Sequence, residues 1–254
     1  MREALHSVSF AISNEETRYY LNGIFLTAVE GEMVMVATDG HKLATYSLGI
    51  NYTGPDLIIH KTTAKHLLKL LNAKSDAPVT VSIGQPREPK DRPAKLGKLK
   101  AKTITFDTGK WTLKCKTIDG AYPDWQRVIP KDPVTTTVKI TQDNASRLAG
   151  FHASSTVKID PKAGTLDLSA TPHPDFNIHL RTEGEGQAFR ANALYLRQFA
   201  NAMGDFTLYG TNPTEPFICR GQNPRLMGVL MPAYVGERVK RKRTATRTAQ
   251  AKTT

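Results

Sequence analysis

Residues 18 to 44 carry the most regular pattern in the sequence, RYYLNGIFLTAVEGEMVMVATDGHKLA. Two apolar, β-prone runs, 24–29 and 33–38, flank Glu30-Gly31-Glu32, and a Gly-centred turn between two such runs predicts a β-hairpin. Asp39-Gly40 follows the second run, and this pair ends the strand because glycine accepts positive φ angles. The segment therefore predicts antiparallel sheet, although the pattern alone fits hairpins of many folds.

The rest of the chain alternates helical and strand-like patterns in an order that repeats. We expect helices over 2–13, 62–72, 143–151 and 192–203, and strands over 43–48, 57–59, 79–83, 102–106, 111–116, 135–141, 155–159, 165–170, 176–182, 206–209, 217–220 and 225–231. Gln142 or Asp143 is the expected N-cap of the third helix. The repeated order of elements predicts a duplicated domain.

Proline-rich and basic segments divide the chain. Residues 122–134 contain Pro123, Pro130 and Pro133 and form the expected linker between domains 1–121 and 135–235. Residues 85–102 hold seven basic and two acidic residues and interrupt a strand pair, which predicts an enlarged basic loop. The tail, 236–254, lacks apolar periodicity and is expected to be disordered. The fold class is α+β, with two tandem domains that each place two helices on one face of antiparallel sheets.

The net charge of +12 comes mostly from the loop and the tail, so a basic surface on the folded body would depend on where its charges lie. No run of 18 apolar residues and no secretory signal pattern is present, so we expect a cytoplasmic protein. Cys115 and Cys219 fall in different domains, which argues against a disulfide or a metal site. The sequence has no P-loop, no nucleophile elbow and no zinc-ligand histidine pair. We expect a binding protein rather than an enzyme, with no cofactor.

Three segments carry a resemblance to a known family. RYYLNG with VATDGHKLA resembles the second domain of the bacterial sliding clamp, the β subunit of DNA polymerase III. YPDWQRVIP, from Tyr122, resembles the segment between its second and third domains, and VLMP, from Val229, resembles its closing segment. The resemblance covers two of the family's three domains. The family has a strand before the first helix that is missing here, which predicts a trimmed domain or a chain that starts inside a longer protein.

The resemblance implies a pocket between the two domains that receives short partner peptides ending in Leu and Phe. The matching positions are Leu21, Thr38, Gly40, His41, Lys42, Leu43, Pro123, Arg127, Val128, Asn192, Tyr195, Val229, Leu230, Met231 and Pro232. Aliphatic and Met side chains supply adaptable walls for such a peptide. Leu43, Val128 and Val229 fit ordinary core positions equally well. The chain continues past the family's end, and its tail could partly cover the pocket.

The resemblance also implies contacts with double-stranded DNA that do not depend on sequence. Tyr19 and Tyr20 match tyrosines at the mouth of the family's ring, and Lys61 matches a basic position inside it. Helical placement adds Lys65, Lys69, Arg147 and Arg197, whereas Glu15 departs from the family's amide or basic residue. The implied partners are DNA, a DNA polymerase, other clamp-motif proteins and a clamp loader.

Assembly follows from counting domains. The family closes six domains into a ring, so a two-domain chain predicts a homotrimer that acts as a DNA-encircling processivity factor. The alternative is a clamp-derived module that binds clamp-partner peptides or nucleic acid without encircling DNA. A basic RNA-binding protein is a third possibility that rests on the loop and the tail alone, without an aromatic stacking motif.

Overall fold

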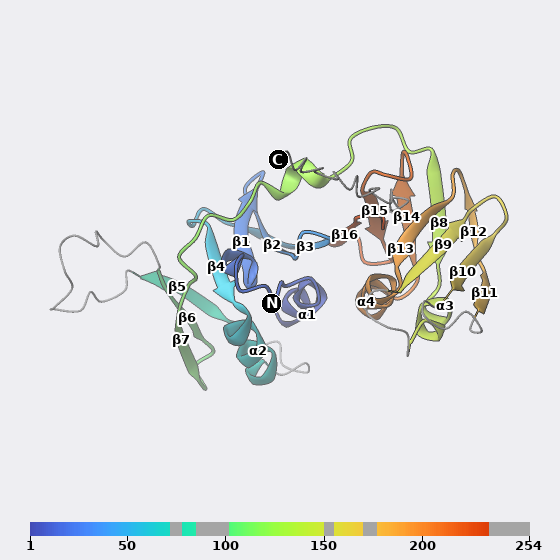
Figure 1. The fold of residues 1–254 in the computed structure, drawn as a ribbon. Helices are drawn as coiled ribbons and strands as arrows, with labels where there is room; N and C mark the ends of the chain where they lie inside the picture. Colours follow the sequence, from blue (N-terminus) through green and yellow to red (C-terminus); the bar gives the residue numbers. More distant parts are fainter. Residues whose placement is uncertain (72–77, 85–101, 150–154, 170–176, 234–254) are drawn as a thin grey trace, which may run out of the picture.

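The chain folds into an α+β protein of helices packed on antiparallel sheets, as the sequence predicts (Figure 1). The structure is a computed structural model, and it describes residues 1–71, 78–84, 102–149, 155–169 and 177–233. The first half contains α1 (Arg2–Ser9), β1 (Gly23–Val29), β2 (Glu32–Thr38), β3 (Lys42–Asn51), β4 (Leu57–His60), α2 (Lys61–Leu70), β5 (Thr80–Gly84), β6 (Thr103–Asp107) and β7 (Thr112–Lys116). A 3₁₀ helix, η1 (Tyr19–Leu21), precedes β1, and another, η3 (Trp125–Val128), lies between the halves.

The second half repeats this order with small additions. It contains β8 (Thr136–Ile140), α3 (Gln142–Arg147), β9 (Thr156–Asp160), β10 (Thr165–Ser169), β11 (Asn177–Arg181), β12 (Glu183–Glu185), β13 (Phe189–Asn192), α4 (Ala193–Met203), β14 (Phe206–Gly210), β15 (Phe217–Arg220) and β16 (Leu226–Leu230). The sequence patterns did not predict the short strands β12 and β13. Residues 85–101 of the expected basic loop and 234–254, which include the expected tail, lie outside the described residues.

One sheet crosses from the first half into the second. Its strand order is β12-β8-β14-β15-β16-β3-β2-β1-β4, and the two halves meet where β16 pairs antiparallel with β3. In that pairing Leu230 lies opposite Lys42, and Gly228 lies opposite Ala44. The remaining strands form a four-stranded sheet, β11-β10-β9-β13, and a three-stranded sheet, β5-β6-β7. The halves therefore share backbone hydrogen bonds as well as side-chain contacts.

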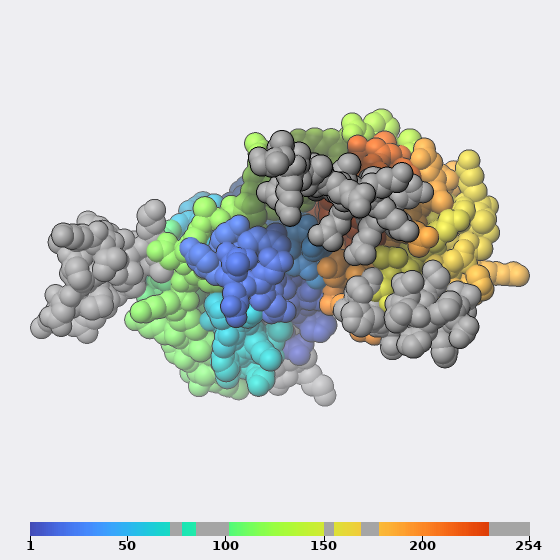
Figure 2. Space-filling model, in the orientation of Figure 1, coloured from blue at the N-terminus to red at the C-terminus, as the bar shows by residue number. Residues whose placement is uncertain are grey.

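The four α-helices of the described residues lie along one side of the molecule (Figure 1). α1 contacts both α2 and α4, and α4 contacts α3, so the order across this layer is α2-α1-α4-α3. Leu5 and Val8 give α1 an apolar face that is fully buried, as expected for a helix that packs on one side. Phe10 packs edge-on against Phe199 of α4 with ring centroids 5.0 Å apart, which joins the halves at the helix layer. In the space-filling view the halves form two lobes in direct contact (Figure 2).

The linker covers a second, smaller core on another face of the sheet. This outer core consists of Val34, Val36, Leu43 and Val229, all buried. Tyr122, Trp125 and Ile129 pack against it from the linker, and the Tyr122 ring stacks on Phe25 with centroids 4.5 Å apart. The linker is therefore held to the sheet by apolar contacts.

Two local expectations were wrong. The N-cap of α3 is Thr141, whose hydroxyl accepts the Asn144 N–H at 3.1 Å; Gln142 and Asp143 already lie within the helix. Threonine can cap here because its extended backbone places the side-chain oxygen over the first turn. α1 ends at Ser9 rather than at residue 13, and Ser13 instead donates its N–H to Leu21 O, which joins the segment after the helix to η1.

Candidate partner-binding site and nucleic-acid surface

The turn between β2 and β3 is built around the Asp39 side chain. Its Oδ1 accepts the backbone N–H groups of His41 and Lys42, both at 2.9 Å. Thr38 Oγ1 donates to Lys42 O at 2.7 Å, and Gly40 adopts a φ of 91°, which glycine tolerates. The Asp-Gly pair of the sequence therefore forms the tight turn that it predicts, and the turn fixes where His41 and Lys42 point.

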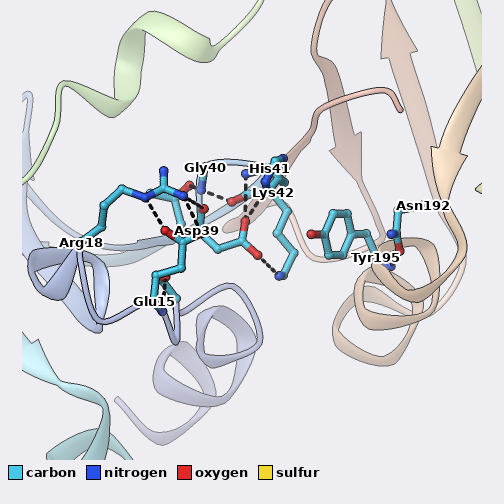
Figure 3. A network of polar contacts seen from close by, with 10 residues as sticks. Glu15, Arg18, Asp39, Gly40, His41, Lys42, Asn192 and Tyr195 are labelled. Atoms are coloured by element: carbon cyan, nitrogen blue, oxygen red, sulfur yellow. Dashed lines mark hydrogen bonds and ion pairs between the residues drawn. The ribbon is translucent and has the colours of Figure 1, made fainter. Parts of the chain in front are cut away.

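Lys42 lies at the junction of the two halves, where its side chain is only 5% exposed (Figure 3). Its ammonium group forms an ion pair with the Asp39 carboxylate and lies 4.4 Å from the ring centroid of Tyr195 on α4. Burial, followed by the nearby Asp39 charge, raises the pKa of the Tyr195 phenol. A buried ammonium needs such partners because desolvation penalises its charge.

Further contacts hold the same region together. Asn192 caps α4 by accepting the Tyr195 N–H on its Oδ1 at 3.2 Å. The His41 ring lies 6.4 Å from the Tyr195 ring, and Met231 donates its N–H to His41 O at 2.9 Å. Seven of the predicted pocket residues thus gather at this junction: Thr38, Gly40, His41, Lys42, Asn192, Tyr195 and Met231.

Sequence reasoning did not identify an ion pair that extends this cluster. Arg18 binds the Glu15 carboxylate through two contacts of 2.7 Å and also donates to Asp39 O at 3.4 Å (Figure 3). The hydrogen bond from Arg18 lowers the pKa of Glu15. The spacing of three residues between Glu15 and Arg18 was the available signal for this pair, in which the Glu15 carboxylate is bound by Arg18.

Other predicted pocket residues lie elsewhere. Leu43 and Val229 belong to the outer core, and Leu21 and Leu230 are also buried, with exposures of at most 3%. These four side chains are packed as core residues. A ligand would reach them only if covering groups, such as Tyr122 and Trp125 over Leu43 and Val229, moved aside.

The remaining predicted pocket residues lie on the linker and among the last residues of the described chain. Pro123, Arg127 and Val128 are exposed. Arg127 and Val128 help line a cavity of about 350 Å³, together with Ile129, Pro130, Lys131, Asp132, Glu215 and Pro216. Pro232 lines a second cavity, of about 310 Å³, with Lys158, Ala188, Phe189, Arg190, Pro213, Thr214 and Ala233. The structure therefore distributes the predicted pocket residues over the junction, other buried positions, two cavities and, for Pro123, the exposed surface of the linker.

The predicted DNA-contacting residues differ in their exposure and in whether their polar groups already bind other protein groups. Tyr19 is 53% exposed, and its ring packs edge-on against Tyr20. Lys65 and Lys69 are exposed on α2, whereas Lys61 Nζ donates to Asn14 Oδ1 at 2.9 Å. Arg147 forms an ion pair with Asp143 at 2.9 Å, and Arg197 is half-buried on α4.

The described residues contain no helix long and apolar enough to cross a membrane and no cluster of side chains able to hold a metal ion. Cys115 and Cys219 are both free thiols, and burial raises the pKa of Cys219.

Together, the helix layer, the sheet shared by two similar halves and the linker over its outer face define a DNA-clamp architecture. A family model described as "DNA polymerase III beta subunit, central domain" matches residues 1–124. The beta sliding clamp of Caulobacter vibrioides is 30% identical to the chain, covering 89% of it and 61% of the relative. The chain is homologous to the bacterial beta sliding clamp.

Solved structures show the same relationship. A sliding clamp from Bartonella birtlesii, bound to griselimycin, is 26% identical and superposes with a TM-score of 0.74 over 92% of this chain and 63% of that one. The polymerase III β subunit of Pseudomonas aeruginosa, 23% identical, has the same fold with a TM-score of 0.74. The chain spans between about a third and three fifths of the length of the curated clamps that it matches.

Proposed function

We propose that the chain is a sliding-clamp-like processivity factor that encircles DNA as a homotrimer and tethers a DNA polymerase or other partners by their peptides. The observation that carries this proposal is the layer α2-α1-α4-α3, which lies side by side under one sheet shared by both halves. Such a layer offers a continuous helical surface to a duplex. The homology to beta sliding clamps, a family without enzymatic activity, supports a binding role rather than catalysis.

Contacts from this layer would be made to phosphates. Lys65 and Lys69 are the exposed cations on α2, and Tyr19 adds an exposed ring on η1. Lysine contacts of this kind are independent of base sequence, and their affinity falls with salt because counterions are released from DNA. Independence of sequence also allows a closed ring to move along the duplex.

Retention on circular DNA tests encirclement. The loaded protein should stay on a nicked circle and leave after the circle is cut. Double substitution of Lys65 and Lys69 with glutamine should reduce the fraction of protein retained on the circle. Replacing Lys162, an exposed lysine in the turn between β9 and β10, with glutamine is the control. Equal release from circular and linear DNA would refute encirclement.

The partner site is tested with a peptide of the Gln-Leu-x-Leu-Phe type. We expect micromolar affinity in fluorescence titration, reduced by Met231→Ala, because Met231 is partly exposed beside His41 at the junction. Leu43→Ala should also reduce binding, but Leu43 is buried, so the loss would include damage to the outer core. No binding to protein lacking residues 236–254 would refute the peptide site.

A second candidate, a clamp-derived module that does not encircle DNA, is favoured by one observation. Two of the predicted DNA-contacting cations, Lys61 and Arg147, are already bound to protein groups. In that case the basic tail, with seven basic residues against one acidic residue over 237–254, would supply the affinity for nucleic acid. The module predicts equal binding to circular and linear DNA that is lost when residues 237–254 are removed.

A further inference from the structure

The three-stranded sheet β5-β6-β7, at the end of the first half away from the junction, has one apolar and one polar face (Figure 1). Its apolar face packs in the main core and consists of Val81, Ile83, Ile104, Phe106, Leu113 and Cys115. Because side chains alternate along a strand, the residues between these point to the opposite face. We call this opposite face the lysine face, and it consists of Thr80, Ser82, Gly84, Thr103, Thr105, Asp107, Thr112, Lys114 and Lys116.

The strand register arranges the lysine face in rows that cross the sheet. The two rows that contain the lysines are Ser82–Thr105–Lys114 and Gly84–Thr103–Lys116. Ser82 is exposed and Thr105 is half-buried, so both hydroxyl groups lie on the lysine side of the sheet. Gly84 is exposed, and no atom lies within 4 Å of where its Cβ would be. The face is therefore open beside the second row, and hydroxyl groups continue from Lys114 across the first.

The charge of this region is strongly positive. The described residues 78–84 and 102–117 hold four basic residues and one acidic residue, whereas the corresponding meander of the second half, 206–230, holds two and one. Lys114 and Lys116 are exposed, and neither side chain has an ion pair or hydrogen bond with another described residue. The acidic residue, Asp107, lies in the row of Thr80 and Thr112, and its Oδ1 already accepts the Gly109 N–H at 2.8 Å. The fold of the described residues therefore leaves the charges of both lysines free for a ligand.

The lysine face matches the chemistry of a DNA backbone. Lys114 and Lys116 lie on the same side of β7, two residues and thus about 6.8 Å apart, which is close to the spacing of successive phosphates in a DNA strand. Lysine ammonium groups and Ser or Thr hydroxyl groups are common ligands of phosphate oxygens. The face has no aromatic side chain on which unpaired bases could stack, which favours a duplex over a single strand.

We propose that the lysine face binds the phosphate backbone of double-stranded DNA, as a second DNA-binding surface separate from the helix layer. This inference goes beyond the proposed function, which places DNA against α1, α2, α3 and α4. Ile104 and Phe106, on the other face of β6, are buried in the core, so the lysines of β7 point away from that core. A duplex bound here contacts the three-stranded sheet and does not pass along the helices.

Fluorescence anisotropy with a short DNA duplex tests this surface in the full chain. Streptavidin bound to both ends of the duplex prevents a closed ring from threading onto it, so binding inside a ring does not contribute. Replacing Lys114→Gln and Lys116→Gln together should weaken binding roughly tenfold at about 0.1 M salt. The slope of log affinity against log salt concentration should fall by about 1.8, since each lost phosphate contact removes about 0.9.

Two further double variants control this experiment. Lys139→Gln with Lys162→Gln removes the same charge from exposed positions on β8 and in the turn between β9 and β10, and should leave the affinity nearly unchanged. Lys114→Arg with Lys116→Arg keeps the charge and should keep the affinity. Circular dichroism checks that each variant is folded.

Three outcomes would overturn the proposal. The first is a loss no larger than in the charge control, and the second is an equal loss in the arginine variant. The third is binding that survives the glutamine substitutions and disappears when residues 237–254 are removed, which would assign the affinity to the tail. A selective loss in the glutamine variant supports the lysine face whether or not the protein is retained on circular DNA, so this result is independent of encirclement.

Discussion

Replacing Lys42 with methionine tests whether the ion pair at the junction stabilises the fold. Methionine keeps a similar length and volume but removes the charge, so Asp39 loses its ammonium partner and the Tyr195 ring loses its cation. Breaking a fully buried ion pair costs about 3–5 kcal/mol. The cost should be smaller here, because the Asp39 side chain is 17% exposed and its carboxylate keeps two backbone N–H donors at 2.9 Å.

These contacts set the expected magnitude. The residual penalty on Asp39 should be about 1–2 kcal/mol, the usual cost of an incompletely satisfied buried group. Loss of the cation–π contact adds about 0.5–1 kcal/mol, and a sulfur–aromatic contact from methionine returns part of it. We therefore expect Lys42→Met to lower the free energy of unfolding by about 1.5–2.5 kcal/mol.

A double-mutant cycle measured by urea denaturation isolates the pair. Asp39→Ser retains a side-chain oxygen for the turn but removes the negative charge, so it is the partner substitution. The two changes should couple by about 1 kcal/mol, with Lys42→Met less costly when Asp39 is already replaced. A coupling below about 0.3 kcal/mol would refute the reasoning, because contacting residues whose interaction matters are not additive.

Three further predictions concern single positions. Burial, followed by the Lys61 charge, lowers the pKa of His60, whose Nδ1 accepts the Thr62 N–H. The folded state therefore favours the neutral imidazole. This contribution to stability is complete above the unfolded pKa of about 6.5 and is lost as pH falls through the lowered pKa of the folded state. The unfolding free energy should therefore fall between about pH 7 and pH 5, and fall less in His60→Asn, as measured by urea titration at both values. Gly228→Ala should cost about 1–3 kcal/mol in the same assay, because its Cβ would lie 2.2 Å from Phe199 Cε1; an unchanged midpoint would contradict the packing. Thr141→Ala should cost about 1 kcal/mol through the lost α3 cap, whereas Thr141→Ser should cost little.

Local sequence patterns predicted much of the fold because turns, strands and helix ends depend on residues that are close together in the sequence. The hairpin of β1 and β2 follows from two apolar, β-prone runs around a Gly-centred turn, and Asp39-Gly40 ends β2 as expected. The N-cap of α3 was missed by one position because Thr141, Gln142 and Asp143 are all polar, and the extended backbone of Thr141 decides among them.

Contacts between distant segments were less accessible to sequence reasoning. The junction forms where β16 meets β3, and the sequence contains no short-range signal for that register. The sequence alone did not show that Lys42 would be buried beside the Tyr195 ring of α4. Leu43 and Val229 matched the family's pocket, yet Tyr122 and Trp125 cover them here, because apolar linker residues gain more by burial than by exposure.

The strand pairing at the junction also limits how the molecule can bend. β3 and β16 are joined by a ladder of backbone hydrogen bonds over five residue pairs, so the halves cannot slide or rotate apart without breaking several bonds together. Phe10 and Phe199 add a contact in the helix layer. Each chain is therefore mechanically stiff at its centre. Amide hydrogens of the β3–β16 ladder should therefore exchange among the slowest in the protein.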